Sequence, residues 1–159
     1  MKIHLIWAQE INSGIGKDGK LPWYISEDIQ NFKKLTLDST ILMGRKTWNS
    51  LSIRPLSKRR NIVLSSKEVA DAECYTSIEE CIEKLDDEGI KKLFVIGGST
   101  VYCNFIHRAD ELHITQVNEM TQGIDTYFPV SMLKIKKQFE KINETELSKK
   151  VIYTQWVKK

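Results

Sequence analysis

The sequence is short of three features, and each shortage excludes a class of protein. It has three cysteines, an odd number, and no second ligand pair at zinc spacing, so we expect reduced thiols, mostly in the core, and no metal site. It has no apolar run long enough for a membrane span or a signal-peptide core. It has no polybasic tail, and its net charge of only +3 suits anionic small molecules better than nucleic acid. We therefore expect a cytoplasmic protein with neither membrane nor nucleic-acid partners.

The length bounds the architecture. The chain has 159 residues, of which 41% are hydrophobic, and this is close to the usual size of one globular domain. No internal repeat, low-complexity tract or linker divides it. We predict a single domain over residues 1–159.

The N-terminal part of the chain predicts a strand, a lid and a helix. Residues 3–8 form an apolar run, and residues 10–20 have the polar, glycine-rich composition of a long mobile loop. Long loops inside a compact domain are usually functional, so we predict a lid. Ser26 is the expected N-cap of a helix that ends near Leu35, with Asp28 in its first turn. The expected inward stripe of this helix consists of Ile25, Ile29, Phe32 and Leu35 or Thr36.

The middle of the chain predicts an α/β arrangement. Residues 40–43, 61–64 and 93–96 are short apolar runs, which are typical of buried parallel strands. Residues 77–85 carry apolar side chains at helical spacing and predict a crossover helix, and residues 101–106 predict another short helix.

The C-terminal part predicts more strands. Residues 111–117 alternate weakly, and residues 138–143 and 151–157 are two further candidate strands joined by a polar linker. This pattern predicts an antiparallel hairpin at the edge of an otherwise parallel sheet.

Glycines, hydroxyls and cations follow three of the predicted strands, where open α/β sheets bind ligands. Gly97 and Gly98 allow a pyrophosphate close to the backbone. The segments Gly44 to Thr47 and Ser65 to Lys67 offer groups that suit phosphates, including the 2′-phosphate of NADP. Taken singly, the glycines more often indicate a tight turn, and the cations more often indicate a solvated helix start. Only their joint placement favours a cofactor site, because the G-x-G-x-x-G fingerprint is absent.

Asp28 is a candidate substrate-binding acid. An acid in the first turn of a helix is usually explained by the helix dipole alone. Here, however, Leu21, Pro22 and Trp23 precede it and Phe32 follows it. Apolar and aromatic surroundings raise the pKa of a carboxyl group, and a carboxylate accepts paired hydrogen bonds from an amino-heterocycle.

In their order along the chain, these segments resemble the dihydrofolate reductase family. The resemblance extends from Ile3 to the last predicted strand, and its segments are Ile15-Gly16, Leu21-Pro22-Trp23, Asp28 with Phe32-Lys33, Met43 to Trp48, Arg54-Pro55-Leu56, Arg59, Leu64-Ser65-Ser66, Ile96-Gly97-Gly98 with Tyr102, and Asp125 to Pro129. It implies a doubly wound, mainly parallel eight-stranded sheet with an antiparallel C-terminal strand and helices on both faces. It also implies a monomer that uses NADPH to reduce 7,8-dihydrofolate to 5,6,7,8-tetrahydrofolate, by hydride transfer to C6 and protonation of N5, and that binds antifolate-type molecules.

The resemblance also assigns roles by position. Asp28 would bind the amino group and ring nitrogen of the pterin, Thr115 would share that network, and Trp23 would hold a water. Leu21 would lie in the lid over the nicotinamide. The implied substrate-binding residues are Ile6, Ala8, Phe32 and Leu51 around the pterin, Arg59 at the glutamate tail, and Lys33 and Arg54 at the rim. The implied cofactor-binding residues are Ala8, Ile15, Gly16, Gly44, Arg45, Lys46, Thr47, Leu64, Ser65, Ser66, Gly97, Gly98, Ser99, Val101 and Tyr102.

Four positions depart from the family pattern. Trp7 stands where many relatives have a small residue and would narrow the pocket floor. Thr100 replaces an arginine found beside the 2′-phosphate in many bacterial relatives, which weakens the case for NADP over NAD. Ser52-Ile53 lengthens one loop, and Ile124, inserted before Asp125, would alter the loop that braces the lid.

Two other functions remain open from the sequence. A pyrimidine reductase of riboflavin biosynthesis would share the architecture, but lacks the Pro-Trp and helix-acid pattern. A non-catalytic nucleotide-binding or RNA-binding module would use Lys58-Arg59-Arg60. No aromatic residues are interleaved there, however, and a solvated turn is the more usual explanation of such a cluster.

Overall fold

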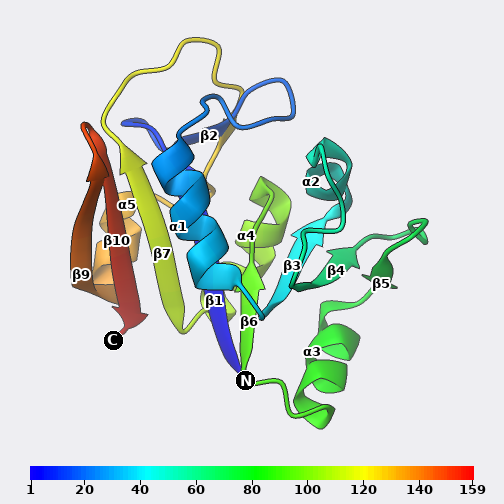
Figure 1. Ribbon diagram of the computed structural model, residues 1–159. Helices are drawn as coiled ribbons and strands as arrows, with labels where there is room; N and C mark the ends of the chain where they lie inside the picture. The colour runs from blue at the N-terminus through cyan, green and yellow to red at the C-terminus, as the bar shows by residue number, and fades with distance from the viewer.

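The first strand of the chain lies in the middle of the sheet. The computed structural model describes residues 1–159, and eight strands form one sheet in the order β5-β4-β3-β6-β1-β7-β10-β9 (Figure 1). β1 (Lys2–Gln9) is parallel to both of its neighbours, β6 (Lys92–Val95) and β7 (Glu111–Val117). The parallel part continues through β3 (Thr40–Gly44), β4 (Arg60–Leu64) and β5 (Glu73–Tyr75).

The C-terminal hairpin closes the other edge. β10 (Val151–Lys158) runs antiparallel to β7 and to β9 (Phe139–Ser148). The predicted fold, a mainly parallel eight-stranded sheet with an antiparallel C-terminal strand, is therefore confirmed. The predicted polar linker is wrong in extent, because backbone pairing carries β9 to Ser148 and leaves only Lys149 and Lys150 between the strands.

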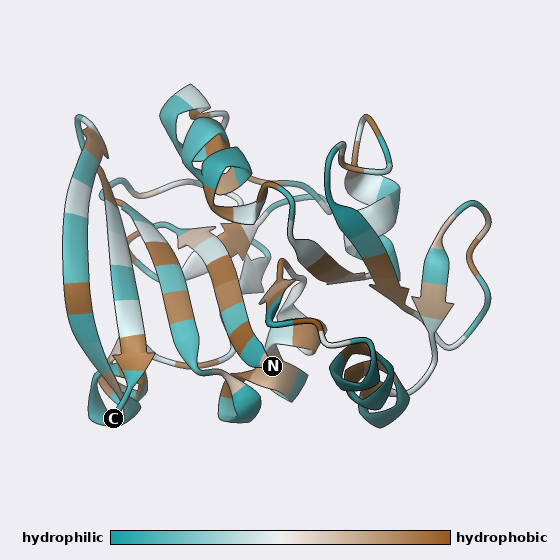
Figure 2. Cartoon of the chain, turned by 60° about the horizontal axis from the view of Figure 1, so that its bottom comes forward, coloured by the Kyte–Doolittle hydropathy of each residue, from teal (hydrophilic) through white to brown (hydrophobic).

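Helices cover both faces of the sheet. α1 (Ser26–Thr36) and α2 (Arg45–Ser50) pack on one face, whereas α3 (Ile78–Asp87), α4 (Ser99–Phe105) and α5 (Met132–Gln138) pack on the other. A 3-10 turn, η1 (Ile106–Arg108), follows α4. Figure 2 shows hydrophobic residues gathered in the inner strands and a mainly hydrophilic β9 at the edge. None of the helices combines the length and the apolar character that a membrane crossing demands.

The start of α1 differs from the prediction. Ile25, not Ser26, is the N-cap, and no side chain caps the helix. The extended backbone of Ile25 aims its carbonyl at the Ile29 N–H, 3.1 Å away, so Ser26 already lies inside the first turn. Ile29 is also 41% exposed, while Asp28 and Phe32 are turned further inward. Phe32 packs against the sheet, and this contact determines which face of α1 points inward. Spacing alone had predicted Ile29, rather than its neighbour Asp28, on that face.

The predicted lid has structure of its own. β2 (Gly14–Gly16) pairs antiparallel with β8 (Thr126–Tyr127) as a separate two-stranded ribbon. The buried Glu10 shapes the loop, because its Oε1 accepts hydrogen bonds from the backbone N–H groups of Asn12 at 2.7 Å and Gly14 at 2.8 Å. Residues 10–20 are thus an ordered, hydrogen-bonded segment rather than an unstructured loop.

Trp7 lies on the opposite face of β1 from Ile6 and Ala8. Its ring stacks on Phe128, with 3.7 Å between ring centroids, and its Nε1 donates to Gln9 Oε1 at 2.8 Å. Side chains alternate along a strand, so Trp7 belongs to the core beneath α4 and α5. The expectation that it narrows the pocket floor is wrong.

The cysteines are all free, but only one lies in the core. Cys81 is fully buried, and burial raises the pKa of its thiol to about 12, so it remains an inert thiol at neutral pH. Cys74 is half-buried and Cys103 is exposed, which contradicts the expectation that most of them lie inside.

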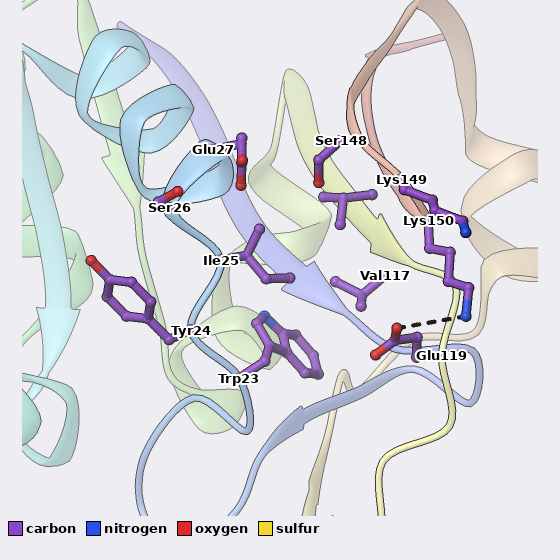
Figure 3. A pocket seen from close by; sticks show the side chains of 11 residues that line it. Trp23, Tyr24, Ile25, Ser26, Glu27, Val117, Glu119, Ser148, Lys149 and Lys150 are labelled. Carbon is purple, nitrogen blue, oxygen red and sulfur yellow. Dashed lines mark ion pairs between the residues drawn. The ribbon is translucent and has the colours of Figure 1, made fainter.

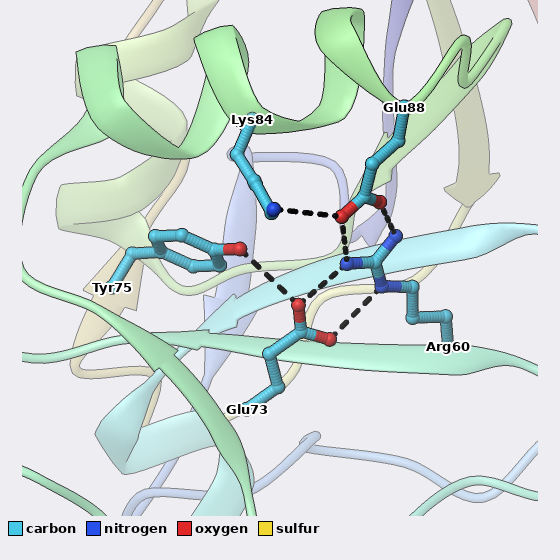
Figure 4. A network of polar contacts seen from close by, with 5 residues as sticks. All are labelled: Arg60, Glu73, Tyr75, Lys84 and Glu88. Atoms are coloured by element: carbon cyan, nitrogen blue, oxygen red, sulfur yellow. Dashed lines mark hydrogen bonds and ion pairs between the residues drawn. The ribbon is translucent and has the colours of Figure 1, made fainter.

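An ion-pair network joins the β4–β5 edge of the sheet to the end of α3 (Figure 4). Arg60 donates to both oxygens of Glu73, with Nε to Oε2 at 2.9 Å and Nη2 to Oε1 at 2.6 Å, and it also pairs with Glu88. Lys84 adds a 3.6 Å contact to Glu88, and the Tyr75 hydroxyl donates to Glu73 at 3.3 Å. Arg60, named in the sequence as part of a basic cluster, is therefore a fully paired structural residue.

Candidate active site

The carboxyl ends of β3 and β6 meet at two glycines. The Gly44 N–H donates to the Gly97 carbonyl at 2.9 Å. A Cβ on Gly44 would lie 3.0 Å from Val101, and a Cβ on Gly97 would lie 3.2 Å from the Tyr102 hydroxyl. Gly97 also has φ of +123°, a conformation open to glycine. Both positions therefore disfavour a side chain, so the backbone is uncovered at this edge of the sheet.

Gly98 lies beside the cationic segment that follows β3. A Cβ there would lie 3.5 Å from Thr47 Oγ1, an ordinary contact distance. Arg45 and Lys46 are exposed and form no ion pair within the chain. Ser65 and Ser66 continue the polar lining after β4, next to β3. The sheet edge thus carries the glycine backbone after β6, unpaired cations after β3 and hydroxyls after β4. These groups fit the diphosphate and the phosphorylated ribose of NADPH.

Val101 and Tyr102 lie beneath this edge rather than on it. Tyr102 is buried, its hydroxyl donates to the Ile6 carbonyl at 2.8 Å, and burial raises its pKa. This bond fixes the end of β1 against α4. Ser99 joins α4 to the two-stranded ribbon of β2 and β8, because its Oγ donates to the Tyr127 carbonyl of β8 at 3.2 Å.

Asp28 has the environment that its neighbours in the sequence predict. Its carboxyl is mostly buried, and this desolvation raises its pKa, while a hydrogen bond with the Thr115 side chain partly offsets the shift. Thr115 lies near the end of β7, directly opposite Ala8 of β1. Asp28, Thr115 and the end of β1 therefore meet where a ligand can reach a desolvated acid.

Trp23 supplies an unused donor just before the start of α1. Its indole N–H is buried and has no hydrogen-bond partner within the chain. A buried N–H of this kind is costly unless a water or a ligand accepts from it. Leu21, two residues earlier, is 58% exposed, and its side chain is free to contact a ligand.

A cavity of about 380 Å³ lies next to Trp23 but does not include Asp28 (Figure 3). Its lining joins the start of α1 to the β9–β10 turn, where Lys150 pairs with Glu119 at 3.8 Å. Val117, at the end of β7, separates the Trp23 side of this cavity from that turn. The Asp28 carboxyl, the Thr115 hydroxyl and the Gly97-Gly98 turn all lie outside this cavity. We therefore place the candidate site at Asp28.

Three of the expected substrate contacts, Ile6, Phe32 and Leu51, belong to one apolar cluster. Phe32 packs with Leu51 against the core that contains Ile6. The Arg59 guanidinium lies 5.8 Å from the centre of the Phe32 ring, and its Nη1 donates to Thr36 Oγ1 at 3.1 Å. The structure thus joins Arg59 to the Asp28 helix, at a place where a carboxylate on a long ligand can be bound.

The two rim candidates lie differently. Arg54 is directed to α2, where its Nη1 donates to the Trp48 carbonyl at 3.2 Å and to Asn49 Oδ1 at 3.3 Å. Lys33 is exposed on α1. Neither side chain contacts Asp28 within the chain, so both belong to the periphery.

The lid is fastened by Asp125, a role that sequence reasoning did not assign to it. Its Oδ2 accepts from the Asp18 N–H at 2.9 Å, and its own N–H donates to the Gly16 carbonyl at 3.1 Å. The hydrogen bonds from the Asp18 backbone and the Thr126 hydroxyl lower the Asp125 pKa. Ile124 packs against Gly14, where a Cβ would come within 2.7 Å of it. Ile15 and Gly16 are therefore held at the sheet edge beside Ser99 and the glycine turn.

Comparison with known proteins agrees with this geometry. A family model described as Dihydrofolate reductase matches residues 2–156. A dihydrofolate reductase of Buchnera aphidicola is 43% identical over 81% of this chain and 80% of its own, and one of Neisseria gonorrhoeae is 36% identical over 97% and 95%. The solved structure of dihydrofolate reductase from Enterococcus faecalis, complexed with NADP(H) and RAB-propyl, has a TM-score of 0.85 and 31% identity, and covers 99% of this chain and 96% of its own.

Proposed function

The chain belongs to the dihydrofolate reductase family, and we propose that residues 1–159 form one domain in which Asp28 anchors the pterin of dihydrofolate. The enzyme reduces 7,8-dihydrofolate to 5,6,7,8-tetrahydrofolate with NADPH. The observation that carries the role of Asp28 is its mostly buried carboxyl, whose pKa is raised by desolvation, beside the Thr115 side chain near the end of β7.

The protein positions the reactants and controls the proton. When bound, NADPH supplies the hydride that reaches C6 of dihydrofolate. Asp28 accepts hydrogen bonds from the pterin amino group and ring nitrogen, which orients the ring and raises the basicity of N5. The unused N–H of Trp23 holds a water near the substrate. That water delivers the N5 proton, so Asp28 acts by orienting and polarising rather than by direct donation.

The pterin lies against Ile6, Ala8, Phe32 and Leu51, and Arg59 binds the glutamate carboxylate. Lys33 and Arg54 act only at the rim. Leu21 covers the nicotinamide from the lid, which limits water around the reacting atoms. Antifolate-type molecules bind through the same acid.

The cofactor lies along the edge from the lid to β4. Ala8, Ile15 and Gly16 contact the nicotinamide, and the turn of Gly97, Gly98 and Ser99 takes the pyrophosphate. The adenine side is lined by Gly44, Arg45, Lys46, Thr47, Leu64, Ser65 and Ser66. Val101 and Tyr102 support this surface from beneath, as the Tyr102 bond to Ile6 indicates. We further propose a cytoplasmic monomer without a nucleic-acid partner.

The test is a spectrophotometric assay of the purified protein with NADPH and dihydrofolate, with NADH as the second cofactor. Asp28→Asn should lower kcat/KM by about 10² to 10⁴-fold near neutral pH, the usual range for loss of one polarising acid. Glu27→Gln is the matched control, because Glu27 is an exposed acid in the same helical turn.

Three results would overturn parts of the proposal. Full activity of Asp28→Asn would exclude the role of the acid while leaving the family intact. An equal loss in Glu27→Gln would show that the effect is one of general charge. Faster turnover of a ribosylamino-pyrimidine than of dihydrofolate would reassign the substrate.

A further inference from the structure

Two histidines and a glutamate meet at the end of the sheet remote from the glycine turns. His4 lies near the start of β1, and Glu111 and His113 lie on the neighbouring β7, on the face that α1 covers (Figure 1). The side chains of both histidines are about 95% buried, whereas that of Glu111 is 26% exposed. Glu111 therefore lies between a buried imidazole pair and the solvent. The reaction at Asp28 uses none of His4, Glu111 and His113.

Three atoms of this cluster have the spacing of ligands around one metal ion. His4 Nδ1 lies 3.0 Å from His113 Nε2, and Glu111 Oε2 lies 3.6 Å from the first atom and 3.8 Å from the second. A circle through the corners of a triangle with these sides has a radius of about 2.0 Å, which equals the usual Zn–N and Zn–O distances. One ion can thus contact all three atoms almost without movement of the backbone.

Neighbouring side chains hold the three proposed metal ligands in place. The Tyr153 hydroxyl lies 2.7 Å from His113 Nδ1, and Gln155 Nε2 donates to Glu111 Oε2 at 3.0 Å. Metal-binding histidines commonly use their second ring nitrogen in such a contact, because it fixes the tautomer and leaves the other nitrogen free. The Phe94 ring packs on His4, with 4.9 Å between ring centroids, and supports it from β6.

Charged groups of both signs surround the two imidazoles. Lys92 and Lys2 oppose a cation here, whereas Glu111 and Asp110 favour one. The site is thus balanced in charge, and Lys92 is the group whose removal should strengthen binding.

We propose that His4 Nδ1, His113 Nε2 and Glu111 Oε2 bind one divalent transition-metal ion, with zinc as the fitting chemistry and water as the fourth ligand. Two imidazoles and one carboxylate form a donor set typical of zinc, and calcium or magnesium would demand oxygen ligands instead. On binding, the ion replaces the proton shared between the two rings, and His4 then carries its proton on Nε2. This site is separate from the folate and cofactor surfaces.

The test uses the full chain, freed of metal with a chelator, in a Cys103→Ser, His107→Asn background. Cys103 and His107 are exposed and one helical turn apart, and this background removes their surface contribution. One equivalent of Co²⁺ should give the visible absorption of a four-coordinate ion. Zn²⁺ at 100 times its Kd should raise the midpoint of thermal unfolding by about 5 °C or more.

Two variants with opposite expected effects separate binding from misfolding. Glu111→Gln keeps the shape of a partly exposed side chain and should weaken Co²⁺ and Zn²⁺ binding by at least about tenfold. Lys92→Met should tighten it several-fold, which damage to the fold would not cause. Absence of the four-coordinate Co²⁺ spectrum would overturn the proposal, and so would equal affinity of Glu111→Gln and its parent.

Discussion

On the face of the sheet beneath α3, α4 and α5, β1 and β7 present Leu5 and Leu112, fully buried and free of polar atoms. On the face beneath α1, the same two strands present His4 and His113, also buried. The first face is continuous with a cluster of 19 buried apolar residues. The second is interrupted by a column of hydrogen-bonding groups between β1, β7 and β10. One backbone thus supports two kinds of interior.

The difference between the faces separates stability from chemistry. Burial of apolar side chains contributes favourable free energy in proportion to area. Buried polar groups are costly unless each is paired, and they are the groups whose properties a ligand can change. We therefore expect substitutions on the first face, away from Val101 and Tyr102 beneath the cofactor edge, to alter folding alone, and substitutions in the column to alter both folding and ligand binding.

The largest expected effect tests the apolar face. Phe105→Ala, in α4, removes a fully buried ring and should lower the free energy of unfolding by about 3 to 5 kcal/mol, because a cavity remains. Urea unfolding measures the loss, and Asn104→Ala on the same helix is the exposed control. The kcat of the folded fraction should stay unchanged. A matching fall in kcat would break the division between the faces.

A smaller effect is expected in the polar column. Tyr153→Phe removes the hydroxyl that contacts His113 Nδ1 and leaves a buried nitrogen without a partner. The free energy of unfolding should fall by about 1 to 3 kcal/mol, the usual cost of such a group. Chemical denaturation of the metal-free protein measures it. Full stability in this variant would mean that the column is not held by its hydrogen bonds.

The third effect has the opposite sign. The Asp28 pKa is raised above its ordinary value of 3.8, so the folded state holds this proton more tightly than the unfolded chain does. Its favourable contribution is complete below pH 3.8 and is lost as the pH rises through the raised pKa. Asp28→Asn should therefore match the parent at low pH and be more stable at neutral pH. Denaturation at several pH values decides this, and a less stable Asn variant at pH 7 would contradict it.

The smallest effect lies outside both faces, at the network of Figure 4. Glu73→Gln weakens a partly exposed ion pair with Arg60 and should cost no more than about 1 kcal/mol. The loss should shrink in high salt, because screening already weakens the pair in the parent. A loss as large as that of Phe105→Ala would show that the edge of the sheet, rather than its interior, limits stability.

Elements with a clear apolar period were predictable from the sequence. The runs that became β1, β3, β4 and β6 bury most of their residues, and the crossover helix predicted over residues 77–85 is present as α3 (Ile78–Asp87). β5 escaped prediction because its three residues are only half-buried, and pairing with β4 defines it. α5 escaped because only Ile135 is fully buried among lysines.

The site was predictable only where its residues lie close together along the chain. The neighbours of Asp28 in the sequence indicated a desolvated acid, and the structure agrees. The lid fastening by Asp125 and the cluster of His4, Glu111 and His113 depend on segments far apart in the sequence. Because strand order brings them together, no local spacing announces them.

The central place of β1 also determines how the molecule must assemble. His4 and His113 touch across 109 residues of sequence, and both neighbours of β1 come from the later part of the chain. Loops of this length must close before the sheet forms, so we expect refolding in milliseconds to seconds rather than microseconds. Until β6 and β7 arrive, β1 is an apolar strand with two open edges, and partly folded chains at high concentration should aggregate through it.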